Sequence, residues 1–99
     1  MADKKYTIEA AESFIADFRN IPKEYHKAIN KKVAKLEINP FTGKKLSGKL
    51  KEIWRIRVGV YRIGYMIKNE KLVILLLKAG HRKNFYDKLT RLASELKNL

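Results

Sequence analysis

The chain has 99 residues, which fits one domain over residues 1–99, and its 45% apolar and 10% aromatic content excludes disorder. Its formal net charge of +13 predicts an anionic partner. The absence of cysteine excludes a disulfide framework, a thiolate nucleophile and a cysteine zinc site. No apolar leader opens the chain, and the longest apolar run, Leu72–Leu77, is too short to span a bilayer. We therefore expect a soluble, cytoplasmic protein without a membrane partner.

The first half of the chain predicts a short strand and two helices. Tyr6–Ile8 is β-prone, and apolar residues recur at helical spacing from Ala10 to Arg19. A second helix starts at Pro22 and stops before Asn39–Pro40. It carries apolar residues on one face and lysines, among them Lys35, on the opposite one. The short link between the helices predicts a hairpin that packs on an apolar surface.

The second half predicts a loop, three strands and a last helix. The loop covers Phe41–Lys51, and the strands cover Ile53–Val58, Tyr61–Lys68 and Lys71–Lys78. The third strand lacks polar alternation, which is typical of a central strand covered on both faces. Asn84 can cap the final helix. The order β-α-α-β-β-β-α predicts an α+β fold, with the helical hairpin packed on a small antiparallel sheet.

Arginines gather on one face of the predicted sheet. If Gly59-Val60 forms a two-residue turn, Arg57 lies directly opposite Arg62, and Arg55 shares their face. Like charges in that position are destabilising, and a phosphate between them would replace repulsion with charge-assisted hydrogen bonds. The alternative is a solvated outer face compensated by nearby glutamates. Residues 38–86 contain 12 Lys/Arg and two carboxylates, which favours the phosphate.

Residues that could act on a bound phosphate follow the third strand. Arg82 can turn into the same cleft, and Tyr86 lies one helical turn further on. Neighbouring cations would favour the phenolate of Tyr86, which makes it a candidate proton acceptor, and His81 is its competitor. No metal-binding, Walker or paired-carboxylate motif is present, so we expect no cofactor. The predicted loop adds further candidate RNA-binding residues: Lys44, Lys45, Lys49 and Lys51.

The order of four short motifs resembles the RelE/ParE superfamily of bacterial and archaeal toxins, and the RelE branch in particular. The motifs are L-x-x-N-P at Leu36–Pro40, K-L-x-G at Lys45–Gly48, W-R-I-R-V-G-x-Y-R-I-x-Y at Trp54–Tyr65 and G-H-R-x-x-x-Y at Gly80–Tyr86. Each motif alone is weak. Their order and spacing extend over nearly the whole chain, which makes the combined pattern specific.

The resemblance implies a ribosome-dependent endonuclease that cleaves messenger RNA. In that chemistry a 2′-hydroxyl attacks the neighbouring phosphate and leaves a 2′,3′-cyclic phosphate and a 5′-hydroxyl. Carried over by motif, Arg62 stabilises the pentacovalent phosphate, Arg82 assists the leaving group, and Tyr86 orients or deprotonates the 2′-hydroxyl. Arg55 and Arg57 stand where bacterial relatives often have lysines. They keep the positive charge for RNA binding, but a guanidinium is a poor proton-transfer group.

The resemblance also implies partners, and it leaves two other functions open. The expected partners are the ribosome, messenger RNA and an acidic RelB-like antitoxin. A first alternative is a ParE-like toxin that acts on DNA gyrase and cuts nothing. ParE-type chains tend to lack the joint set of Arg62, Arg82 and Tyr86, which this chain has. A second alternative is a basic RNA-binding module without activity.

Overall fold

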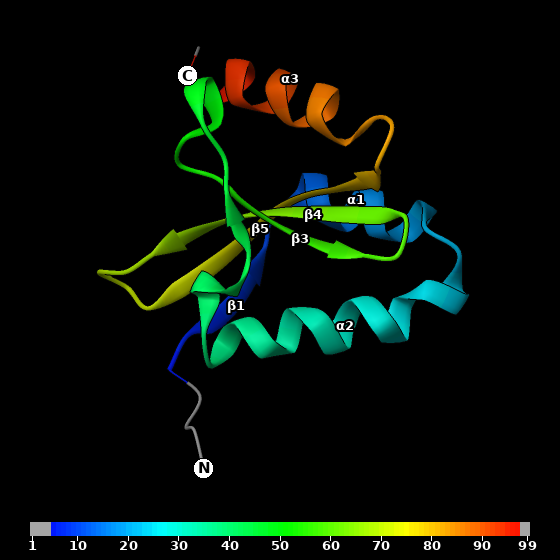
Figure 1. Cartoon of the computed structure of the whole chain (residues 1–99), viewed down its shortest axis with the longest axis horizontal. Helices are drawn as coiled ribbons and strands as arrows, with labels where there is room; N and C mark the ends of the chain where they lie inside the picture. Colours follow the sequence, from blue (N-terminus) through cyan, green and yellow to red (C-terminus); the bar gives the residue numbers. More distant parts are fainter. Residues whose placement is uncertain (1–4, 98–99) are drawn as a thin grey trace.

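The computed structural model describes the backbone of residues 5–97 and the side chains of residues 5–95. Its strands and α-helices, in chain order, are β1 (Thr7–Ala10), α1 (Glu12–Asn20), α2 (His26–Ala34), β2 (Lys44–Lys45), β3 (Trp54–Val58), β4 (Tyr61–Lys68), β5 (Val73–His81) and α3 (Phe85–Lys97) (Figure 1). Short 3-10 turns lie at Lys23–Tyr25, Lys35–Glu37, Pro40–Thr42 and Gly48–Leu50. Within residues 5–97, no helix combines the length and the apolar character needed to cross a membrane.

The five strands form one sheet in the order β1-β5-β4-β3-β2. The predicted α+β class is confirmed, and β5 is central, between β1 and β4. The antiparallel prediction holds for β2 to β5 but is wrong for β1, which pairs with β5 in parallel. Strand β2 was expected to be loop, because two lysines carry no strand pattern; it forms by pairing with β3.

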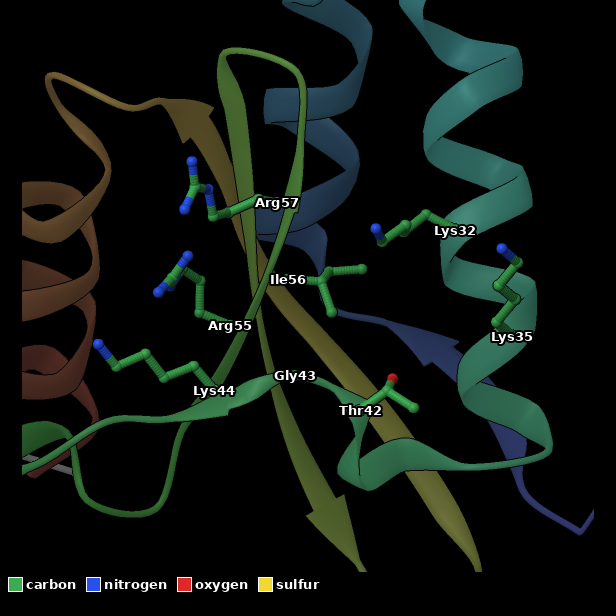
Figure 2. Close-up of a pocket in the computed structure, with 8 residues that line it drawn as sticks. All are labelled: Lys32, Lys35, Thr42, Gly43, Lys44, Arg55, Ile56 and Arg57. Carbon is green, nitrogen blue, oxygen red and sulfur yellow. The ribbon is translucent and has the colours of Figure 1, made fainter.

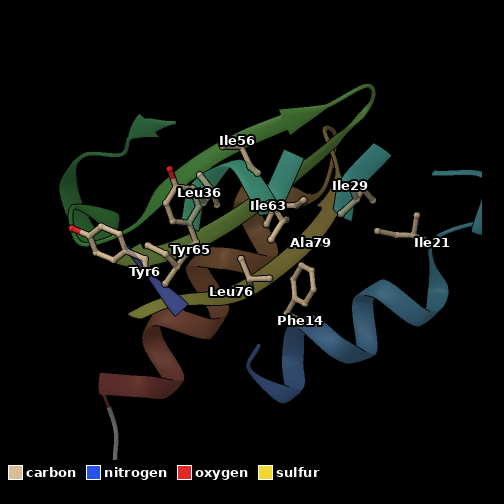
Figure 3. Close-up of a cluster of buried hydrophobic side chains, with 12 residues drawn as sticks. Tyr6, Phe14, Ile21, Ile29, Leu36, Ile56, Ile63, Tyr65, Leu76 and Ala79 are labelled. Carbon is tan, nitrogen blue, oxygen red and sulfur yellow. The ribbon is translucent and has the colours of Figure 1, made fainter. Parts of the chain in front are cut away.

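The two sheet faces are covered by different helices (Figure 1). Helices α1 and α2 pack on one face, which we call the hairpin face, and α3 packs on the other. The main apolar core lies under the hairpin (Figure 3). Its fully enclosed side chains include Ile29 and Leu36 from the second helical segment and Ile63, Tyr65 and Ile74 from the sheet. The predicted packing of the hairpin on an apolar surface is confirmed.

Helix α3 approaches the sheet closely because a glycine lies beneath it. Phe85 and Leu89, both fully buried, rest on Gly64 of β4. A Cβ atom at Gly64 would lie 3.1 Å from Phe85 Cζ and 3.2 Å from Leu89 Cδ1. These two side chains form a second apolar cluster with Ile53 and Leu77.

Strand β5 ends later than predicted, and its stretch beyond the end of β1 is covered by α1. It spans Val73–His81 instead of Lys71–Lys78, because Ala79 and Gly80 continue the ladder with β4. Beyond β1, α1 supplies the hydrogen bonds that a further strand would make. Ser13 Oγ donates to Leu77 O at 2.5 Å, and Ala79 N donates to Asp17 Oδ2 at 3.0 Å.

A buried tyrosine fixes the chain segment that leads into β2. Tyr65 Oη donates a hydrogen bond to Pro40 O at 2.6 Å. Burial raises the pKa of Tyr65 to about 12, and the Gly43 backbone offsets this only in part. Gly43 itself lies against β3, since a Cβ atom there would be 2.7 Å from Arg55 O. The turn before Lys44 is therefore held against both β3 and β4.

Candidate nucleic-acid interface

The predicted register of the arginines is confirmed. Arg57 lies directly opposite Arg62, and the turn between β3 and β4 is Gly59-Val60 with a φ of +60° at Gly59. That positive φ suits a type II′ turn with glycine first. Arg55 pairs with Lys44 on the neighbouring strand. Strand alternation places Lys44, Arg55, Arg57 and Arg62 on the side of the sheet that α3 covers, and we call this set the arginine face.

Two arginines of this face have buried donor atoms without an acceptor. Arg55 is only 9% exposed and its Nε has no hydrogen-bond partner; Nε and Nη1 of Arg62 are buried and equally unpartnered. No carboxylate of the described residues pairs with the arginines of this face, and the described ion pair joins Lys78 to Asp17 at 3.3 Å. Unpaired buried charge is destabilising. Arg57 and Lys44 are exposed to solvent, whereas the buried donors of Arg55 and Arg62 are compensated by no glutamate of the described residues, and an anion would satisfy them.

Arg82 and Tyr86 lie at the same end of the sheet. The backbone N–H of Arg82 donates to Val60 O at 2.7 Å, which holds Arg82 beside the β3–β4 turn. Gly80 lies directly opposite Arg62, and a Cβ at Gly80 would be 3.5 Å from the Cα of Phe85 at the start of α3. Tyr86 follows at once and is 40% exposed. Arg82 is exposed as well.

His81 lies on the other face of the sheet. It pairs with Tyr61, whose ring centroid is 6.1 Å away in an edge-to-face contact. Tyr61 packs against the hairpin core. The Nδ1 atom of His81 accepts a hydrogen bond from Lys83 N at 3.3 Å. The structure therefore brings Arg62, Arg82 and Tyr86 to one end of the sheet and places the side chain of His81 against the hairpin face.

The four candidate lysines separate into different places, and all are exposed. Lys44 joins the arginine face through its pairing with Arg55. Lys45 and Lys51 line a groove of about 210 Å³ that also contains Trp54. Lys49 lies in the 3-10 turn Gly48–Leu50.

Two lysines that the sequence analysis did not select lie close to the arginines. Lys32 of α2 and Lys35, in the turn that continues α2, line a groove together with Arg55 and Arg57 of β3 (Figure 2). The expectation that Lys35 lies on the helix side away from the sheet is therefore wrong. Their spacing of three residues, which puts both on one side of a helix, was the available signal.

The sequence is similar to those of known toxins. A family model described as the ParE-like toxin of type II bacterial toxin–antitoxin systems matches residues 8–90. The curated protein "Putative toxin RelE1" of Methanocaldococcus jannaschii is 25% identical over 87 residues, which cover 83% of this chain and 96% of the relative.

Solved structures of toxin–antitoxin complexes have the same fold. The RelBE2 complex of Mycobacterium tuberculosis matches with a TM-score of 0.73 and 25% identity, covering 78% of this chain and 98% of the matched one. The RelB–RelE complex of Methanococcus jannaschii matches with a TM-score of 0.64 and 28% identity, covering 80% and 95%. The family match spans most of the chain and includes both arginine strands. This protein belongs to the ParE-like toxins of type II toxin–antitoxin systems, within the RelE/ParE superfamily.

Proposed function

We propose that this toxin is a metal-independent endoribonuclease that cleaves messenger RNA on the ribosome and so stops translation. The observation that carries the proposal is the half-buried Arg62, whose Nε and Nη1 atoms are buried and unpartnered and which lies opposite Arg57 across the ladder. Without an anionic ligand this arrangement destabilises the fold, because like charges lie opposite each other and buried donors lack acceptors. A phosphodiester accepts several hydrogen bonds at once and carries the charge that the site lacks.

The reaction needs one new bond and one broken bond at phosphorus. The 2′-oxygen of the upstream nucleotide attacks the phosphorus, and the bond to the 5′-oxygen of the next nucleotide breaks. Arg62 donates to the non-bridging oxygens, where negative charge grows in the transition state. Tyr86, acting as the phenolate, accepts the 2′-hydroxyl proton, and Arg82 stabilises the departing 5′-oxygen. That oxygen takes a proton from water, and the hydroxide formed takes the proton back from Tyr86. The products are a 2′,3′-cyclic phosphate and a 5′-hydroxyl.

Tyr86 is our choice for the proton acceptor, and His81 is the other candidate. Tyr86 is exposed and directly follows Phe85, which packs over Gly80, the strand residue opposite Arg62, and this supports the choice. The edge-to-face contact of His81 with Tyr61 argues against His81, because the hairpin face carries no part of the arginine set. Arginine itself does not give up a proton at neutral pH.

RNA binding is the proposed role of the remaining cations. Arg55, Arg57 and Lys44 hold the strand on the arginine face, since they form one continuous set with Arg62. The exposed lysines Lys45, Lys49 and Lys51 extend the positive surface beyond it. A basic surface of this size also suits the ribosome, whose surface is largely RNA phosphate.

An acidic antitoxin is the proposed partner that silences the toxin in the cytoplasm. Relatives of this chain have been crystallised as RelBE2 and RelB–RelE complexes. An antitoxin of amphipathic helix would place apolar anchors on the toxin and carboxylates over the arginine face. Opposite charge would speed the encounter, and the apolar anchors would supply most of the affinity.

The test is cleavage of a defined message on purified ribosomes. Wild-type toxin should cut within the decoding site and leave a 5′-hydroxyl, and Arg62→Ala should lower the rate ~10²–10³-fold. Arg91→Ala removes the same charge from an exposed position on α3 and should cut like wild type. A wild-type toxin that leaves messages intact but inhibits DNA gyrase would overturn the proposal in favour of the ParE-like alternative.

A further inference from the structure

We propose that the groove between α2 and the outer edge of β3 binds phosphates of an RNA strand, next to those on the arginine face. This second phosphate site rests on the proposed RNA-cleaving function and extends it to residues outside the reaction centre. The groove has a volume of about 480 Å³ and is lined by Lys32, Lys35, Thr42, Gly43, Lys44, Arg55, Ile56 and Arg57 (Figure 2). Five of these eight residues are cationic, and none is acidic.

The groove exists because β2 is too short to cover β3. Pairing between the two strands ends at Lys44 and Arg55, so Arg57 has no strand neighbour on its outer side among the described residues. The chain leaves the edge at Gly43, whose backbone packs against Arg55 O and the side chain of Tyr65. Helix α2 runs alongside, and Lys32 reaches from it toward β3, with Lys35 in the turn that follows, whereas the side chains of Lys44, Arg55 and Arg57 leave the sheet edge on the side away from α2 (Figure 2).

The other end of the sheet shows that this bare edge is not simply a property of the fold. Where β5 extends beyond the end of β1, Ser13 and Asp17 of α1 satisfy backbone groups that β1 does not reach. At the outer edge of β3, the residues in the corresponding position are lysines and arginines, which donate hydrogen bonds and repel one another. The backbone groups beside β1 are therefore satisfied by the protein itself, whereas the edge of β3 presents hydrogen-bond donors that an external acceptor could satisfy.

Two features of this edge match a phosphate. In the ladder that closes with the two-residue turn, Arg57 turns its backbone N–H away from β4, toward the groove. Arg55, 9% exposed and with an unpartnered Nε, belongs to both the groove and the arginine face. A phosphate chain that leaves Arg62 can therefore pass Arg55 and Arg57 over the edge and meet the lysines of α2 without crossing an acidic residue.

The lining favours RNA over a protein strand. An added peptide strand would also pair with the bare edge, but its alternate side chains need apolar pockets for specificity. Here the lining offers one apolar side chain, Ile56, among five cations. Consecutive phosphodiesters that cross the edge would meet cations on both sides of β3. The RNA can be the message itself or ribosomal RNA, and the experiment separates these sources.

The experiment compares two double variants of full-length toxin. Lys32→Gln/Lys35→Gln removes two charges from the groove. Lys27→Gln/Lys31→Gln removes two charges from exposed positions of the same helix that do not line it. Binding is measured against salt concentration, first with a 12-nucleotide single-stranded RNA carrying 2′-O-methyl groups, then with small ribosomal subunits lacking message. The 2′-O-methyl RNA cannot be cut by the proposed chemistry, so binding is read independently of cleavage.

The expected result is a slope of log K against log salt that is about 1.4 shallower in the groove variant, because two single-strand phosphate contacts are lost at about 0.7 each. The control should change the slope much less. A change with the oligonucleotide identifies the message as the source, and a change confined to the subunit identifies ribosomal RNA; either outcome supports the groove. Equal slopes for both variants in both arms would overturn it.

Two further outcomes separate this inference from the proposed function and from the protein alternative. If wild-type toxin fails to cut messages but the groove variant still shows the shallower slope, the proposed activity is wrong and the phosphate site in the groove is supported. A groove variant with unchanged RNA binding and weaker binding to an acidic antitoxin peptide would overturn the inference and assign the edge to a protein strand.

Discussion

Strands β3 and β4 place side chains of opposite character on the two faces of the sheet. On the hairpin face, β3 and β4 contribute Ile56, Ile63 and Tyr65, all at most 5% exposed, to one closed apolar core (Figure 3). On the other face, the intervening residues Arg57 and Arg62 oppose each other across the ladder. The hairpin face therefore stabilises the fold, and the arginine face stores unfavourable electrostatic energy that a bound phosphate would release.

This division shows how a 99-residue chain can hold an unfavourable charge cluster. Strand alternation places each arginine next in sequence to a core residue, so the buried neighbours fix the position of the guanidinium groups. Helix α3 covers only part of the arginine side, through Phe85 and Leu89. The cations that remain uncovered are held close together before any ligand arrives, as the proposed stabilisation of a transition state would require.

The largest expected effect on stability comes from alanine substitution of two residues that are adjacent in sequence but lie on opposite faces of the sheet. Ile63→Ala should lower the free energy of unfolding by about 2–5 kcal/mol, because it opens a cavity at a fully enclosed position. Arg62→Ala should leave it unchanged or raise it, because repulsion with Arg57 disappears. Urea denaturation of both variants checks the pair. Equal destabilisation by both changes would mean that Arg62 is structural, and the contrast between the faces would fail.

The second prediction separates the two faces by chemistry. Tyr86→Phe removes only the hydroxyl of an exposed side chain at the start of α3 and should lower the cleavage rate ~10²-fold or more, as expected for loss of a proton acceptor. His81→Gln changes a side chain on the hairpin face and should leave the rate within a few fold. Single-turnover cleavage on ribosomes measures both. The reverse pattern would make His81 the proton acceptor.

The faces were largely predictable from the sequence, because their determinants are local. The turn glycine Gly59 and the period of two in the flanking strands fix the Arg57–Arg62 pairing without any knowledge of tertiary contacts. The apolar run of β5 likewise predicted its central place.

Other features depend on partners distant in sequence and could not be predicted. The parallel pairing of β1 and the short strand β2 exist only through β5 and β3. Glycine at position 80 indicated the end of a strand, whereas the ladder continues beneath α3 and carries His81 to the hairpin face. The position of Lys32 and Lys35 beside the arginines likewise depends on how the helical hairpin packs along β3.

The third prediction uses pH to probe the hairpin face. Tyr65 has a folded-state pKa of about 12 against an ordinary value of 10.0, so folding favours its protonated form. The resulting stability is fully present below pH 10 and is lost as pH rises through 12, by up to about 2.7 kcal/mol. Tyr65→Phe lacks this loss but also lacks the hydrogen bond to Pro40 O. Its unfolding free energy should start lower and approach that of wild type between pH 10 and 12.

Comparison of the two proteins in denaturant titrations at each pH removes the contribution of lysines, which titrate equally in both. Curves that stay parallel from pH 8 to pH 12 would show that the phenol of Tyr65 does not titrate differently in the folded and unfolded states.

The smallest expected effect tests how the glycine under α3 links the faces. Gly64→Ala should destabilise the fold by about 1 kcal/mol, since its methyl group meets the fully buried rings and methyls of Phe85 and Leu89 at 3.1–3.2 Å. Gly80→Ala is the matched control, because its methyl would meet α3 at an ordinary 3.5 Å. Displacement of α3 should also move Tyr86 away from Arg62, so Gly64→Ala should lose more cleavage activity than its stability loss explains. Thermal denaturation and cleavage rates of both variants decide this: if the two glycine substitutions behave alike, the close approach of α3 has no part in placing Tyr86.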